Sequence, residues 1–188
     1  MEPVTLRTPR FELYAPTVAD VDAIHAACQD ADIQRYTTVP SPYPRSQAEA
    51  FIGRVAAEWA EGVHLSWGIH RDGVLVGMIG LYRLDGAGAG ELGYWIAPAA
   101  RGDGAVREAA RAVIDWGFSS AGARLARIEW RAVVGNLSSA RAARALGFRY
   151  EGTLRGALRH GSGIRDDGWI AGMLSDDDRS PVAWPVLD

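Results

Sequence analysis

The segment 91–110, ELGYWIAPAARGDGAVREAA, is the part of the chain that most constrains the fold. Its first half has the apolar pattern of a strand and reaches Pro98. A glycine-rich turn, RGDG at 101–104, then leads directly into a helical pattern. A helix that begins in such a turn presents unpaired backbone N–H groups at its positive end. The segment therefore predicts an anion site suited to a phosphate or pyrophosphate.

Composition indicates an ordinary globular protein. The 188 residues are 48% hydrophobic and 23% charged, which predicts a single domain over 1–188, with a core of about 4–175 and a loosely packed tail at 176–188. A net charge of −3 gives no strong field for nucleic acid. Cys28 is the only cysteine, which favours a reducing compartment, and no apolar run approaches the ~20 residues of a membrane span. We expect a cytoplasmic protein without a membrane partner.

The order of predicted elements is β-α-α-β-β-β-α-β-α-β-β. Antiparallel strands come first and a β-α-β crossover follows, so we expect an α/β (α+β) fold with a mixed, mostly antiparallel central sheet. It should have six to seven strands flanked by about four helices. The predicted segments are an extended stretch at 5–16, helices that start at Thr17 and Ser46, a hairpin of 64–70 with 74–84, a strand at 91–97, a helix to Phe118, a strand at 125–133, a helix from Asn136 to Gly147, and a strand pair of 148–158 with 167–174.

Three motifs occur in order. The strand ELGYWIAP at 91–98 precedes the turn at 101–104, which matches the first part of an Arg/Gln-x-x-Gly-x-Gly/Ala signature. A second motif combines Asn-x-x-Ser at 136–139, Leu-Gly-Phe at 146–148 and Glu-Gly-Thr at 151–153. With these motifs, residues 4–175 resemble the GNAT superfamily of acetyl-CoA-dependent acetyltransferases. Within it the chain looks most like the RimJ/RimL type, the ribosomal-protein-alanine N-acetyltransferases, which acetylate protein N-termini and related amines.

The resemblance implies the GNAT fold and acetyl-CoA as co-substrate, without a metal. Val106 stands where the family usually has Gly or Ala, and it either crowds the phosphates or turns into the core. Asp103 occupies a place that is often basic, whereas Arg107 replaces a small hydroxyl residue and offers a charge to the phosphates. The implied cofactor-binding residues are Ile96, Ala97, Arg101, Gly102, Asp103, Gly104, Ala105, Val106, Asn136 and Ser139.

Two side chains are candidates for proton transfer. Glu91 lies on the strand that leads to the cofactor, where family members often carry an acid, and is either the general base or a solvated strand-end glutamate. Many GNAT enzymes protonate the departing thiolate with a tyrosine, whose position here is Ala143. The resemblance to RimL assigns that role to Ser139, and a structural helix serine is the alternative. Asn136 either binds the cofactor arm or caps its helix.

The acceptor side is less constrained. Backbone N–H groups at 94–97 are expected to polarise the thioester carbonyl, and Tyr36, Tyr82 and Tyr94 are candidate acceptor-binding residues. The leading hypothesis is direct acetyl transfer to a primary amine on a protein N-terminus or a small molecule, with a possible homodimer. The alternative is an acyl-CoA-binding sensor of the same fold with impaired catalysis. A doubly wound nucleotide-binding fold is disfavoured because antiparallel strands precede the glycine turn.

Overall fold

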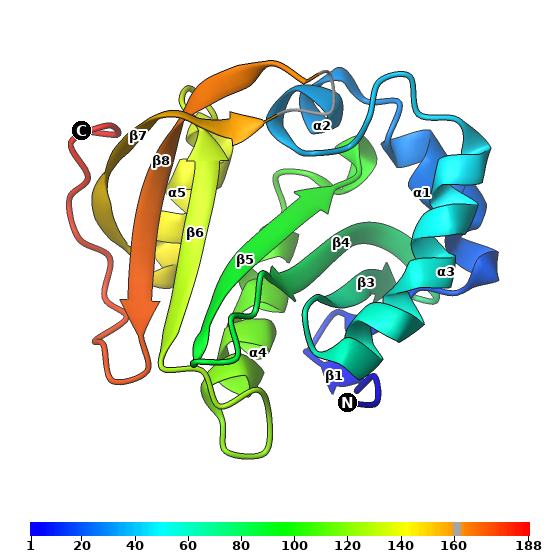
Figure 1. Ribbon diagram of the computed structural model, residues 1–188, viewed down its shortest axis with the longest axis horizontal. Helices are drawn as coiled ribbons and strands as arrows, with labels where there is room; N and C mark the ends of the chain where they lie inside the picture. The colour runs from blue at the N-terminus through cyan, green and yellow to red at the C-terminus, as the bar shows by residue number, and fades with distance from the viewer. Residues whose placement is uncertain (160–162) are drawn as a thin grey trace.

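The computed structural model describes residues 1–159 and 163–188. In this part of the chain an eight-stranded sheet has the order β1-β2-β3-β4-β5-β6-β8-β7 (Figure 1). The β5 and β6 strands run parallel and the other described neighbours are antiparallel, so the predicted mixed sheet is confirmed. The strands are β1 (Leu6–Arg7), β2 (Glu12–Tyr14), β3 (Leu65–Arg71), β4 (Val74–Tyr82), β5 (Ala89–Ile96), β6 (Arg127–Val133), β7 (Arg149–Arg159) and β8 (Arg165–Leu174).

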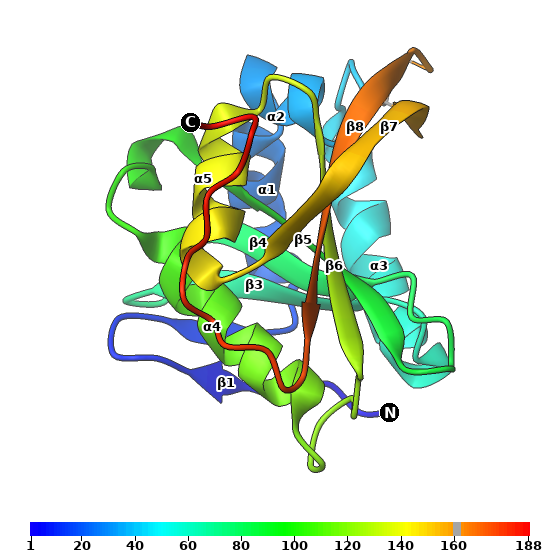
Figure 2. The same ribbon diagram turned by 90° about the vertical axis from the view of Figure 1, so that its left-hand side faces the viewer.

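Helices cover both faces of the sheet. Figures 1 and 2 show α1, α2 and α3 on one side and α4 and α5 on the other. The helix α4 is the crossover between the parallel strands β5 and β6, as the β-α-β pattern predicts. The five α-helices of the described residues are α1 (Val21–Ala27), α2 (Ala31–Tyr36), α3 (Arg45–Glu61), α4 (Ala105–Phe118) and α5 (Leu137–Leu146).

The expected numbers of strands and helices were both too small. The stretch 5–16 is not one extended segment, because Thr8 and Phe11 close a turn that separates β1 from β2. The extra helix α2 begins at Asp30, whose carboxylate accepts the N–H of Ile33 at 3.0 Å. Both errors concern short elements, in which one turn or one cap outweighs the weak periodicity of six residues or fewer.

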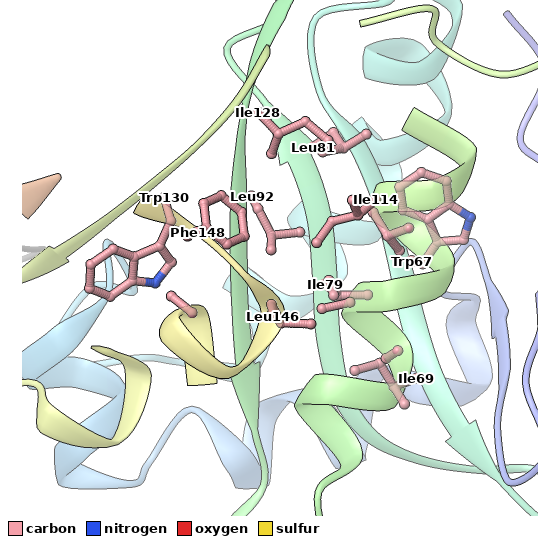
Figure 3. Close-up of a cluster of buried hydrophobic side chains, with 14 of the residues drawn as sticks. Trp67, Ile69, Ile79, Leu81, Leu92, Ile114, Ile128, Trp130, Leu146 and Phe148 are labelled. Atoms are coloured by element: carbon pink, nitrogen blue, oxygen red, sulfur yellow. The ribbon is translucent and has the colours of Figure 1, made fainter. Parts of the chain in front are cut away.

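The main core lies between the sheet and α4 and α5. Ile79, Leu81 and Leu92 project from neighbouring strands toward Ile114 of α4, and all are at most 1% exposed (Figure 3). A second cluster beneath α1 contains Cys28, and burial raises the pKa of its thiol to about 11. The thiol is therefore protonated at neutral pH, which agrees with a packing role and excludes a thiolate nucleophile.

The segment 176–188, which we call the strap, is not loosely packed as the sequence suggested. It runs along α5 and α4 (Figure 2). Trp184 is 0% exposed, and its indole N–H donates to the carbonyl of Phe148 at 3.1 Å. The acidic and proline residues that indicated a loose tail lie mostly on its outer side, whereas one tryptophan anchors it.

The close crossing of the strap over Gly147 predicts a stability effect. Gly147 has φ +99°, and a Cβ there would lie 2.5 Å from the Cα of Arg179. Gly135 has a similar φ of +95° with open space around it, so both glycine-to-alanine changes cost the left-handed conformation, about 1–2 kcal/mol. Gly147→Ala must also displace the strap, and we expect a total of about 3 kcal/mol by urea denaturation. Equal losses for Gly147→Ala and Gly135→Ala would contradict the packing of the strap.

Candidate active site

A cleft opens where β5 and β6 separate. The two strands pair from Ala89 with Arg127 to Leu92 with Trp130 and then diverge. Residues 93–96 of β5 and 130–133 of β6 line a cleft of about 1120 Å³. The cleft extends from the glycine turn to α2 and α3, so it passes from one side of the sheet to the other.

Pairing with β4 decides which backbone groups of β5 face this cleft. The N–H of Ala97 donates to Val76 O at 2.9 Å, and the carbonyl of Ala97 accepts from Ala100 at 2.9 Å. Because hydrogen bonding alternates along an antiparallel ladder, the backbone groups of Tyr94 and Ile96 face the opening. The expected pairing role is therefore available to the Ile96 N–H, whose own carbonyl accepts from Arg101 Nε at 3.2 Å, but not to Ala97, whose polar groups are both engaged. The sequence alone does not show which alternate residues of β5 turn their backbone groups toward the cleft.

The glycine turn has the geometry of an anion site. Gly102 and Gly104 have φ of +85° and +83°, values that favour glycine. The N–H of Ala105 donates to Asp103 Oδ1 at 3.0 Å. The N–H groups of Gly104 and Val106 have no hydrogen-bond acceptor among the described residues. The Val106 side chain packs partly against the core and also lines the cleft.

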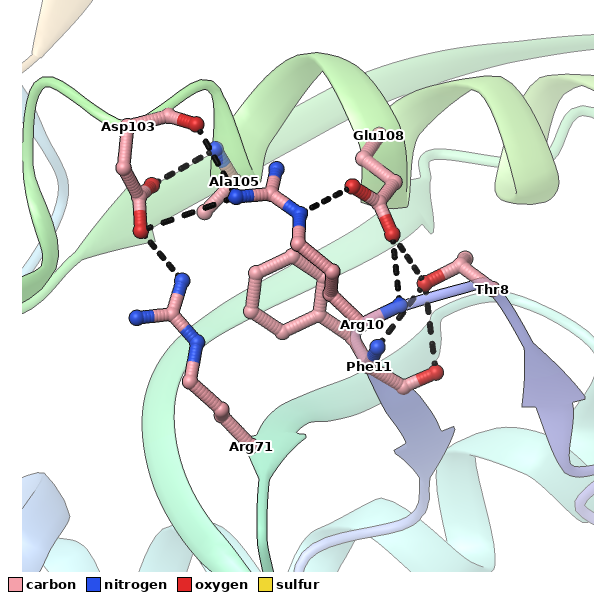
Figure 4. Close-up of polar contacts among 7 residues, drawn as sticks. All are labelled: Thr8, Arg10, Phe11, Arg71, Asp103, Ala105 and Glu108. Atoms are coloured by element: carbon pink, nitrogen blue, oxygen red, sulfur yellow. Dashed lines mark hydrogen bonds and ion pairs between the residues drawn. The ribbon is translucent and has the colours of Figure 1, made fainter.

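Asp103 does not direct its charge into the cleft. Its carboxylate pairs with Arg71, and Arg10 donates to the carbonyl oxygen of Asp103 at 3.1 Å (Figure 4). Arg10 also binds Glu108 at 2.6 Å, and Glu108 accepts from Thr8 at 2.7 Å. The Arg71 hydrogen bond holds the pKa of Asp103 below its usual range. The network neutralises the unusual acid and ties the β1–β2 turn to the start of α4.

Arg101 is committed to α2 rather than to the glycine turn. Its guanidinium donates to Asp30 at 2.5 Å and to Asp32 at 3.3 Å, and its Nε donates to the carbonyl of Ile96 at 3.2 Å. Burial would raise the pKa of Asp30, but hydrogen bonds from Arg101 and from the Ile33 N–H lower it overall. Arg101 therefore joins the turn, β5 and the acceptor side. Arg107, by contrast, is exposed at the cleft beside the turn.

Glu91 lies in the cleft on the paired part of β5. Its side chain is 17% exposed, accepts a hydrogen bond from Arg83 at 2.7 Å, and has Arg131 Nε at 3.6 Å. Burial raises the pKa of Glu91, and the two arginines only partly oppose that effect. The structure thus favours a half-enclosed carboxylate over the solvated strand-end alternative. A carboxylate in this environment binds a proton at higher pH than an exposed one.

Ser139 lies at the centre of a polar contact across the cleft. Its hydroxyl accepts a hydrogen bond from the indole N–H of Trp130 at 3.0 Å and lies 2.9 Å from the hydroxyl of Tyr94. Burial raises the pKa of Tyr94. Sequence reasoning considered Ser139 and Tyr94 separately and missed Trp130, because the motif gives no sign that β6 supplies a donor.

The remaining candidate residues also surround the cleft. Asn136 caps α5 by accepting the N–H of Ser139 at 3.2 Å, so its structural alternative is observed, and it also lines the cleft. Tyr36 and Tyr82 line the end near α2 and α3. Asp103 and Ala97 lie outside the described lining. In the described residues, no group of three His, Cys, Asp or Glu side chains is placed to hold a metal, and no helix is long and apolar enough to cross a membrane.

The environment of Glu91 predicts how its titration responds to substitution. Removing the Arg83 guanidinium takes away the charge that most favours the carboxylate, so Arg83→Gln should raise the pKa of Glu91 further above its usual range. The measurement is ¹³C NMR titration of the Glu91 carboxyl. Arg7→Gln, which removes an exposed pair with Glu12, is the control and should leave Glu91 unchanged. A Glu91 titration that does not move in Arg83→Gln would show that the 2.7 Å contact is not formed in solution.

Comparisons with known proteins agree with this geometry. The model of the acetyltransferase (GNAT) domain matches residues 10–149. The N-acetyltransferase YoaA of Bacillus subtilis (strain 168) is 33% identical over 153 residues, which cover 80% of this chain and 85% of YoaA.

Two solved structures share the fold. Mycobacterium smegmatis RimJ in complex with CoA-disulfide has a TM-score of 0.79 at 24% identity and covers 93% of this chain and 90% of its own. The ribosomal L7/L12 alpha-N-protein acetyltransferase RimL in complex with coenzyme A has a TM-score of 0.82 at 19% identity. The match covers 93% of this chain and 100% of the RimL chain. The family match, the YoaA likeness and the divided sheet lead to one conclusion: this chain is an acyltransferase that belongs to the GNAT N-acetyltransferase family.

Proposed function

We propose that this protein transfers an acetyl group from acetyl-CoA directly to a primary amine on a protein N-terminus or a small molecule. The observation that carries the proposal is the cleft between β5 and β6, which joins the free N–H groups of the glycine turn to Glu91 and Ser139. The CoA bound to RimJ and RimL, which share the fold, supports the choice of cofactor. A homodimer stays a prediction.

The cofactor would occupy the cleft from the side of the glycine turn. The N–H groups of Gly104 and Val106 would hold the pyrophosphate at the positive end of α4. Arg107 is the nearby exposed cation that can add charge. The backbone groups of Tyr94 and Ile96 would pair with the pantetheine amides as an added strand. This arrangement brings the thioester into the space between β5 and Ser139.

The transfer needs a neutral amine, a polarised carbonyl and a proton for the thiolate. Glu91 takes the amine proton, directly or through water, since its pKa is raised by burial. The neutral amine nitrogen forms the new C–N bond and releases its second proton to water in the cleft, and β5 N–H groups stabilise the oxyanion. As the C–S bond breaks, Ser139 gives its hydroxyl proton to the thiolate and recovers one from Tyr94 or water.

The sensor alternative is less well supported. It was motivated by Asp103, by Val106 and by the alanine at position 143. Asp103 is neutralised by arginines outside the cleft lining, and Val106 packs partly against the core. Tyr94 supplies a hydroxyl beside Ser139 in place of the tyrosine absent from α5. These contacts support the enzyme over the sensor.

Cofactor binding should depend on the glycine turn. Gly104→Trp places an indole against the free N–H groups and should abolish acetyl-CoA binding in calorimetric titration. Gly73→Trp is the matched control, because Gly73 has φ +78° in the open β3–β4 turn and carries the same backbone strain. Micromolar binding by Gly104→Trp would place the cofactor elsewhere.

Glu91 should matter most at low pH. An α-amino group has a pKa of about 7.7–8.0, so a base is needed below that range and becomes dispensable above it. Glu91→Gln should lower turnover of peptide acceptors ~100-fold near pH 6.5 and much less near pH 9, with acetyl-CoA affinity unchanged. In the native protein, activity should fall as the pH drops through the raised pKa of Glu91. A uniform loss at every pH would argue for a structural role.

A further inference from the structure

A continuous set of contacts leads from the strap to the candidate acid. The Trp184 ring lies 5.5 Å from the Trp130 ring, centroid to centroid, and Trp130 donates its indole N–H to the Ser139 hydroxyl. Both tryptophans are at most 1% exposed. Figure 3 shows Trp130 beside Phe148, whose carbonyl holds Trp184. Trp184 therefore packs against Trp130, which lines the cleft, without itself belonging to the described lining.

Ion pairs hold the strap both before and after Trp184 in the sequence. The carboxylate of Asp188 accepts a hydrogen bond from the backbone N–H of Trp184 at 2.7 Å and pairs with Arg144 of α5 at 2.7 Å. Arg179 pairs with Asp115 of α4 at 2.5 Å. Because Arg144 and Ser139 belong to the same helix, the strap fixes Trp184 relative to the helix that carries the acid.

The direction of the hydrogen bonds gives the contact a chemical consequence. An indole N–H can only donate, so Trp130 occupies a lone pair of Ser139 Oγ. With that lone pair occupied, the serine hydroxyl can donate to Tyr94, whose own hydroxyl donates to the Ser139 carbonyl at 3.3 Å, or into the cleft, where a departing thiolate would lie. A displaced Trp130 would free the hydroxyl to rotate, and it would lose this orientation.

We propose that the strap is a positioning element for proton transfer, in which Trp184 acts through Trp130 to orient the hydroxyl of Ser139. This inference rests on the proposed function for the role of Ser139. It assigns a catalytic consequence to a segment outside the matched family domain, which ends at residue 149. Within the strap, Val182, Val186 and Leu187 also pack against the core, and Trp184 is the residue that reaches Trp130.

The first test needs no activity. The Trp130 indole resonance is identified in a ¹H–¹⁵N spectrum by its disappearance in Trp130→Phe. We expect Trp184→Phe and Ser139→Ala each to shift this resonance and to speed its hydrogen exchange. Trp59→Phe is the matched control, since Trp59 is also 0% exposed and donates to a backbone carbonyl at 3.1 Å. An unchanged Trp130 resonance in folded Trp184→Phe would overturn the inference.

The second test is kinetic. Trp184→Phe should lower kcat about 10-fold with the KM for acetyl-CoA unchanged, whereas Trp59→Phe should lower stability but not kcat. In a Ser139→Ala background, Trp184→Phe should cause no further loss, because its effect passes through Ser139. An equal loss in both backgrounds would overturn the inference. If Ser139→Ala alone leaves kcat unchanged while the Trp130 resonance responds as expected, the proposed acid is wrong, and with it the catalytic meaning of the strap.

Discussion

The separation of β5 from β6 is the constraint on which the rest of the site depends. In the described chain the strands share four paired positions, from Ala89 to Leu92 on β5, after which each stays with its own half of the sheet. β5 remains bonded to β4, and β6 remains bonded to β8 as far as Val133. Backbone N–H and C=O groups between the halves are left facing a cleft, and such groups need a partner. In the proposed function the cofactor supplies that partner as an added strand, so the divided sheet would both shape the site and favour its occupant.

Local features of this site could be predicted from the sequence because their conformations are set by a few neighbouring residues. Gly102 and Gly104 occupy the left-handed region, and Gly147 ends α5, as their positions in the motifs suggested. Asn136 caps α5 through a hydrogen bond that spans three residues. The fold class followed from the order of these elements. In each case the physical cause lies within one turn of the chain.

What the sequence could not show depends on distant partners. Arg101 matches a cofactor motif, yet Asp30 and Asp32, about 70 residues away, determine its orientation. Trp184 lies in a stretch whose composition indicates a loose tail, and the carbonyl that binds it belongs to Phe148. The chain has no lysine, so each long-range ion pair with a basic side chain such as Arg101 uses a guanidinium, which can bridge two elements at once. The residue type shows that such a bridge is possible, but it does not identify the partner.

Glu91 shows how such arginine contacts change the proton affinity of a buried carboxylate. A fully solvated carboxylate would be a weak base toward an ammonium group, whereas an isolated buried one would stay protonated at neutral pH. Here burial dominates the pKa of Glu91, and Arg83, just after β4, and Arg131 of β6 oppose it. Arg131 lies at the first position of β6 past the region that pairs with β5. The divergence of the two strands therefore opens the cleft and also sets how the arginines and burial act against each other on the pKa of Glu91. The geometry that admits the cofactor thereby also adjusts the proton affinity of the proposed base.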